Sequence, residues 1–164
     1  QTCALPIYLV SQERAVFSKS TNNTTTMAVT GITLRDEVMS VFNELKLGKG
    51  LQYVIYRMTP DFKEVEVEKK VEAPATWEAF VADLPKDDCR YAVFDYQFTT
   101  ETDGDRNKLI FVLWTPETAR IKTKMLYPAT KEAMKRALVG ISTEVQATDE
   151  AEISLDAIKE RFAK

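Results

Sequence analysis

Residues 109–140, LIFVLWTPETARIKTKMLYPATKEAMKRALVG, decide the fold, because they join a short apolar run to a long basic segment. The apolar run, LIFVLW at 109–114, has the length of a buried strand. Beyond it, apolar residues recur every four positions, at Ile121, Met125, Ala129, Ala133 and Ala137. This spacing predicts a helix, although Pro128 lies in its middle.

Proline normally interrupts a helix, so the segment could form two helices or one bent helix. Pro128 has no N–H, which leaves the carbonyl of Lys124 without its usual partner, and the proline ring crowds that carbonyl. The row of apolar residues nevertheless continues across the proline, which favours one bent helix. We expect Ile121 and Ala129 to face inward, and Met125 to contact a partner; burial of Met125 in the core is the alternative.

The charge of the protein is unevenly distributed along the chain. The formal net charge is −3, yet residues 106–136 contain eight basic and two acidic side chains, which leaves −9 for the remainder. Arg120, Lys124, Lys131 and Lys135 fall within about 60° of one another on a helix. This stripe indicates a specific anionic partner and no general affinity for nucleic acid, and a solvated helix face is the simpler alternative.

Composition excludes several classes of protein. The chain has the length of one domain and no apolar run of roughly 18 residues, so we expect no transmembrane segment. It contains no histidine, which excludes Ser-His-Asp catalysis, histidine zinc sites and a histidine pH switch. Cys3 and Cys89 indicate neither a disulfide framework nor a metal cluster. The segment DGDRN at 103–107 has Lys108 where a calcium loop needs glycine. We therefore expect no catalytic residue, no metal, no cofactor and no enzymatic activity.

The composition changes near Met27. Residues 1–26 contain no pattern that continues into the next element, and STNNTTT at 20–26 is typical of a polar linker. We expect residues 1–26 to be a disordered extension that is not native. The expected domain is then 27–164.

The remaining pattern predicts helices and strands in alternation. We expect helices over 33–45, 76–84 and 154–162, with Thr33, Thr76 and Ser154 as their N-caps. Strands are expected over 51–58, 64–72, 90–98, 108–115 and 141–147, with a polar turn between the third and the fourth. The predicted fold class is α/β of the α+β type, a central mixed sheet with helices on both faces.

Residues 109–140, with LPKDDCRYAVFDYQF at 84–98 and DEVMSVFNELKL at 36–47, resemble the actin-depolymerising factor/cofilin family. The specific signal is Trp-x-Pro-Glu-x-Ala at 114–119 followed by Lys-x-Lys-Met-x-Tyr at 122–127. The likeness spans 27–164 and is strongest to the short cofilins of fungi and amoebae, the actophorins among them. It implies the family's homology fold, with the long helix kinked near Pro128.

The resemblance also implies a function. Family members bind monomeric and filamentous actin, prefer its ADP form, sever and depolymerise filaments, and so promote actin turnover. It implies a monomer in the cytoplasm, at the actin cytoskeleton, with nuclear entry left open, and phosphoinositide headgroups as a second partner. Actin and these lipids are both anionic, which fits the basic stripe. The alternative is a phosphoinositide-binding membrane-surface module without actin remodelling.

The resemblance assigns roles to individual positions. Those that match the family's actin contact are Thr30, Gly31, Lys122, Lys124 and Met125. Those that match the contact with a second filament subunit are Arg106, Lys108, Glu160 and Arg161. Those that match phosphoinositide binding are Lys131, Lys135 and Arg136. The second set could instead be solvated surface charge. Thr30 stands where many relatives have a regulatory phosphoserine, which leaves that switch in doubt.

Overall fold

A computed structural model describes residues 31–100 and 104–162, and the side chains of 98–100, 104–106 and 162 are outside the description. The expectations for residues 1–26 and for Thr30 therefore lie outside the described residues. So does the side chain of Arg106.

The described residues form a six-stranded mixed sheet in the order β1-β3-β2-β4-β5-β6. The strands are β1 (Thr33–Leu34), β2 (Leu51–Met58), β3 (Glu64–Glu72), β4 (Arg90–Thr100), β5 (Gly104–Trp114) and β6 (Thr143–Ala147). The four central strands pair antiparallel, and β1 and β6 are added in parallel to β3 and β5. The predicted mixed sheet is confirmed.

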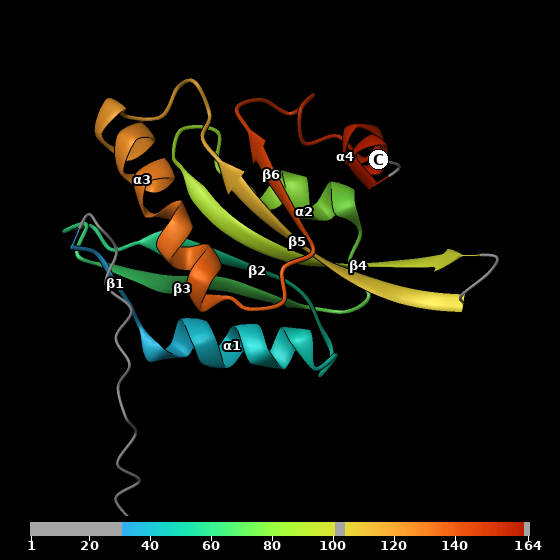
Figure 1. Cartoon of the computed structure of the whole chain (residues 1–164). Helices are drawn as coiled ribbons and strands as arrows, with labels where there is room; N and C mark the ends of the chain where they lie inside the picture. The colour runs from blue at the N-terminus through green and yellow to red at the C-terminus, as the bar shows by residue number, and fades with distance from the viewer. Residues whose placement is uncertain (1–30, 101–103, 163–164) are drawn as a thin grey trace, which may run out of the picture.

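Helices cover both faces of this sheet, as the sequence predicts (Figure 1). The helices of the described ranges are α1 (Asp36–Lys46), α2 (Trp77–Asp83), α3 (Ile121–Ala137) and α4 (Leu155–Phe162). Buried residues of α1 and α3 share one core with the first face, and those of α2 and α4 share another with the second. None of the helices in the described part of the chain combines the length and apolar character needed to cross a membrane.

The two cores follow from the alternation of side chains along the strands. Val54 and Tyr56 of β2 point to the core under α1 and α3, whereas Tyr53 and Ile55 point to the other core. Successive side chains of a strand lie on opposite faces, so a strand covered on both sides is apolar throughout. This explains why LIFVLW at 109–114 is continuously apolar and fully buried.

Helix α3 is continuous through Pro128, which confirms one helix instead of two. The expected inward side was wrong, however, because Ile121 is 80% exposed and Ala129 is exposed as well. Each step of four residues advances about 40° around a helix, so the apolar row rotates from solvent toward the sheet. Only its last two members, Ala133 and Ala137, are buried.

Two local predictions were also wrong. Thr33 is no helix cap but part of β1, where its N–H donates to the carbonyl of Lys63 at 2.9 Å, and α1 begins only at Asp36. The polar turn before β5 is shorter than expected, because Thr100 pairs with Gly104. Within the described ranges, the outer halves of β4 and β5 pair only with each other and project beyond the other strands (Figure 1). Of these outer halves, Leu109 still belongs to the core under α1 and α3 and Tyr96 packs against the other core, whereas the sequence beyond them is polar and resembles a turn.

Tyr127 ties α3 to the centre of the sheet. Its hydroxyl accepts a hydrogen bond from the backbone N–H of Met58 at 2.9 Å, and its carbonyl accepts one from the Tyr91 hydroxyl at 2.6 Å. The hydroxyl of Tyr56 lies in the same core but has no partner among the described residues. One buried tyrosine hydroxyl in this core is therefore hydrogen-bonded and the other is not, so removing each one tests what the hydrogen bond contributes to stability.

Replacing Tyr127 with Phe is expected to lower the free energy of unfolding by about 1–3 kcal/mol, because the buried N–H of Met58 loses its acceptor. Tyr56→Phe is the matched control and should be neutral or stabilising, since its hydroxyl already lacks a partner. Denaturant unfolding measures both. Equal losses in the two variants would contradict this assignment.

Asp95 places a carboxyl group inside the sheet. Its side chain is 2% exposed, one oxygen accepts from the Asn107 amide at 3.1 Å, and the other has no partner within the described ranges. Burial raises the pKa of the Asp95 carboxyl above its usual value, and the bond from Asn107 only partly opposes this. The folded state therefore holds this proton more tightly than the unfolded chain does.

The stability that protonated Asp95 provides should be present at low pH and lost as the pH rises through the folded-state pKa. Asp95→Asn is therefore expected to stabilise the protein at neutral pH by about 1.4 kcal/mol per unit of pKa elevation. The advantage should vanish in strong acid. Unfolding free energies of both proteins as a function of pH provide the measurement, and a pH-independent difference would contradict the prediction.

Candidate functional site

The first turns of α3 present apolar and cationic side chains together to solvent. Ile121 is 80% and Met125 69% exposed, and Lys122 between them is also exposed. Lys124 is half-buried, with its ammonium group 3.2 Å from the carbonyl of Glu117. Large exposed apolar side chains next to unpaired charge are typical of a protein-binding surface. We call Ile121, Lys122, Lys124 and Met125 the α3 patch.

The local backbone explains where this helix begins. The segment before it turns at Pro116, whose carbonyl accepts from the N–H of Ala119 at 3.0 Å. The Thr123 hydroxyl then donates to the carbonyl of Arg120 at 2.8 Å, so the Thr123 side chain is hydrogen-bonded to the first turn of α3. The early N–H groups of a helix lack intrahelical partners, so the positive end of α3 adds to the charge of its lysines.

The N-terminal segment reaches the same region through the turn between β2 and β3. Gly31 is exposed at φ +76°, a conformation that favours glycine, and Ile32 beside it is buried. Thr33 is hydrogen-bonded to Lys63, and the ammonium group of Lys122 lies 4.4 Å from the centre of the Phe62 ring. The structure thus connects Thr33, two residues after Gly31, and Lys122 to adjacent residues of one turn.

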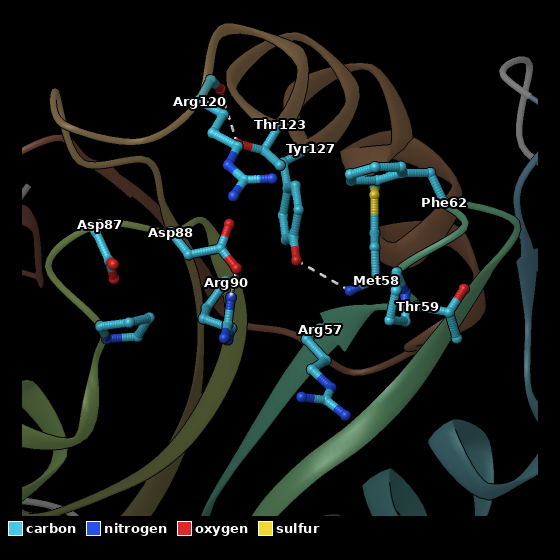
Figure 2. A pocket seen from close by; sticks show the side chains of 12 residues that line it. Arg57, Met58, Thr59, Phe62, Asp87, Asp88, Arg90, Arg120, Thr123 and Tyr127 are labelled. Carbon is cyan, nitrogen blue, oxygen red and sulfur yellow. Dashed lines mark hydrogen bonds and ion pairs between the residues drawn. The ribbon is translucent and has the colours of Figure 1, made fainter.

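A cleft of about 410 Å³ borders the α3 patch. Its walls come from α3, from the end of β2 with the turn that follows, and from the segment before β4 (Figure 2). Its lining includes Arg57, Met58, Phe62, Asp88, Arg120 and Tyr127.

Arg90, also in the lining, bonds to Glu68 and Asp88 at 2.6 Å each. Burial alone would lower the pKa of Arg90, but these two carboxylates raise it, so its charge is neutralised internally.

The second half of α3 presents a different arrangement. The ammonium groups of Lys131 and Lys135 lie 2.5 and 2.7 Å from the two carboxylate oxygens of Glu144 in β6. Burial would raise the pKa of Glu144, but the two lysines outweigh it and lower that pKa, and Glu144 raises the pKa of Lys135. Arg136 is exposed. We call Lys131, Lys135 and Glu144 the Glu144 cluster.

The residues expected to contact a second filament subunit lie apart from the α3 patch. Glu160 and Arg161 are exposed on α4, which covers the sheet face opposite to α3. Lys108 is half-buried on the projecting part of β5. The structure therefore separates the predicted residues into surfaces on different sides of the sheet.

Sequence reasoning missed three residues of these sites, and the first is Ile121, which was expected to face inward. Glu144 gives no signal of its own, because acidic residues on a half-exposed strand are common. Phe62 does give one, since an aromatic residue within a polar turn is unusual, but its neighbour on α3 is 60 positions away in the chain. Within the described ranges, no three His, Cys, Asp or Glu side chains are grouped so that they could hold a metal ion.

Comparison with known proteins gives a consistent result. Residues 31–163 match the family of cofilin/tropomyosin-type actin-binding proteins. Actophorin of Acanthamoeba castellanii is 50% identical over 136 residues, which cover 83% of this chain and 98% of the actophorin. Cofilin of Schizosaccharomyces pombe is 41% identical over 138 residues, covering 84% and 99%.

Solved structures agree. Cofilin of Streptomyces griseoflavus superimposes with a TM-score of 0.74 at 40% identity, over 80% of this chain and 96% of that cofilin. The resemblance to amoeboid and fungal cofilins is thereby confirmed, and so is the expected fold. On this evidence the chain belongs to the family of cofilin/tropomyosin-type actin-binding proteins.

Proposed function

We propose that this chain binds monomeric and filamentous actin, severs and depolymerises filaments, and thereby promotes actin turnover at the actin cytoskeleton. The observation that supports this most directly is the α3 patch, in which exposed Ile121 and Met125 lie beside Lys122 on a helix of an actin-binding family. In this proposal Lys122, Lys124 and Met125 contact the actin monomer, together with the segment that contains Thr30 and Gly31.

The composition of the patch suits a large acidic partner. Burial of two exposed apolar side chains supplies affinity, whereas the lysines accelerate the encounter and select for negative charge. Met125 is flexible and polarisable, so it can adapt to an uneven surface. A bend at Pro128, as proline inside a helix favours, would let α3 follow a concave surface better than a straight helix does.

Severing requires contact with two subunits of a filament at once. We assign the second contact to Arg106, Lys108, Glu160 and Arg161. The position of Glu160 and Arg161 on the sheet face opposite to α3 supports this division, since two surfaces on different sides of one domain can touch two different subunits. A domain inserted in this way alters the spacing or twist of the subunits that it contacts.

Replacing Lys122 and Lys124 with Ala is expected to weaken actin binding about ten-fold or more, because two cationic contacts at the centre of the interface are removed. Filament length by microscopy and pelletable actin by sedimentation measure the effect. The wild-type chain should shorten filaments and reduce the pellet, and the double variant should do neither at the same concentration.

Lys49→Ala with Lys70→Ala is the matched control, since both lysines are exposed and outside the proposed surfaces. This control should act like the wild type. Filaments that stay unchanged with the wild-type protein would overturn the proposed function. They would favour the alternative, a phosphoinositide-binding module without actin remodelling.

We also propose that Lys131, Lys135 and Arg136 bind phosphoinositide headgroups as a second, competing ligand. The support is that two lysines already converge on one anionic group, the carboxylate of Glu144. A phosphate group would have to displace that carboxylate. Glu144 then weakens the lipid affinity of its own cluster.

Glu144→Gln is therefore expected to tighten binding to vesicles that contain phosphatidylinositol bisphosphate by about five-fold, because lysine charge is released toward the membrane. Glu78→Gln is the control, since it removes the same charge from an exposed position on α2, on the opposite face of the sheet. Vesicle sedimentation at fixed salt measures both. Equal gains in the two variants would show that only net charge matters, and would contradict the role of Glu144.

A further inference from the structure

The turn between β2 and β3 is fixed by its own hydrogen bonds. The hydroxyl of Thr59 accepts from the N–H of Glu64 at 3.1 Å and donates to the carboxylate of Asp61 at 2.5 Å. The N–H of Phe62 donates to the carbonyl of Thr59 at 2.8 Å. This turn therefore has a defined shape and can position other groups.

Phe62 has an uncommon backbone conformation in this turn. Its φ is +58°, the left-handed region that bulky residues rarely adopt, so the surroundings must hold it there. Its ring is half-buried against the core under α1 and α3 and lines the cleft beside the α3 patch (Figure 2). Packing of the Phe62 ring against this core thus offsets the cost of its left-handed backbone conformation.

The ring of Phe62 lies beneath the ammonium group of Lys122. The distance from Nζ to the ring centre is 4.4 Å, well within the range of a cation–π interaction. Lys122 forms no ion pair with any residue in the described ranges. Lys131 and Lys135 differ, because a carboxylate orients them.

The same turn also holds the N-terminal segment. The carbonyl of Lys63, next to Phe62, accepts from the N–H of Thr33 at 2.9 Å and from its hydroxyl at 3.4 Å. Two consecutive residues of one turn thus contact the two segments that the proposed function places on the actin monomer. The turn therefore holds Thr33, two residues after Gly31, and Lys122 relative to each other.

We propose that Phe62 is a positioning residue of the actin interface, which holds Lys122 in its binding orientation beside the turn that also binds the N-terminal segment. This inference rests on the proposed actin-monomer contact of Lys122. A free lysine loses several rotatable bonds when it docks, and a ring that already confines the ammonium group reduces that loss. The expected gain in affinity is about two- to five-fold, the size of an exposed cation–π interaction.

The test uses the full chain with three substitutions. Two of them replace Phe62 with another side chain that is not glycine, so the left-handed backbone at position 62 stays equally unfavourable, and the third leaves position 62 unaltered. Phe62→Leu retains an apolar side chain but removes the ring face, and Phe62→Tyr retains the ring face as the matched control. Lys122→Met removes the charge and keeps the length of the side chain. Affinity for fluorescently labelled actin monomers is measured for each protein and for the Phe62→Leu/Lys122→Met double variant.

Phe62→Leu is expected to weaken actin binding about two- to five-fold, whereas Phe62→Tyr should bind like the wild type. In the Lys122→Met background, Phe62→Leu should cause no further loss, because the group that the ring positions is gone. The same loss in both backgrounds would mean that Phe62 acts independently of Lys122, and would overturn the proposal. A wild-type chain without any affinity for actin would refute the proposed function itself.

A second readout separates positioning from general stability. In NMR spectra, the ε-methylene protons of Lys122 should be shifted upfield by the ring in the wild type and in Phe62→Tyr. The shift should disappear in Phe62→Leu, even where thermal unfolding shows that this variant is folded. Lys122 signals at the usual lysine position in the wild-type protein would contradict the inference without reference to actin.

Discussion

The burial of both faces of the sheet is the constraint on which the rest of the structure depends. Strands β2, β4 and β5 are apolar on both sides, so each face must be covered by a layer of helices. Helix α3 can present a binding surface because its buried side is fixed against this sheet, above all by Tyr127. A functional surface on a regular element is positioned more accurately than one on a loop.

Much of the fold could be predicted because it depends on periodicity along the chain. Strands β2 and β3 match the expected 51–58 and 64–72, and α3 continues through Pro128 as the spacing indicates. The errors arise where a neighbour distant in sequence decides. Thr33 has the chemistry of a cap, but pairing with Glu64 in β3 makes it a strand residue. The inward side of α3 was misjudged because a four-residue row rotates around the helix.

The candidate site was less accessible to sequence reasoning than the fold. A motif can indicate that Lys122 is functional, but it cannot show which lysines are already neutralised. That depends on Glu144, which approaches Lys131 and Lys135 only because β6 is added in parallel beside β5. The lysines of one helix are therefore electrostatically unequal. Those near its start are available to a partner, whereas those near its end are partly occupied.

The edge of the sheet at β3 has a consequence for solubility. Among the described residues, β1 pairs with two residues of β3, so the rest of β3 is an outer edge of the described sheet, where other chains could add by backbone pairing. This edge is rich in charged side chains, with Glu66 and Glu68 followed by Lys69 and Lys70. The N–H of Val67 donates to the carboxylate of Glu37 at 3.3 Å. The charged side chains and the occupied N–H of Val67 thus oppose edge-to-edge aggregation of this protein through β3.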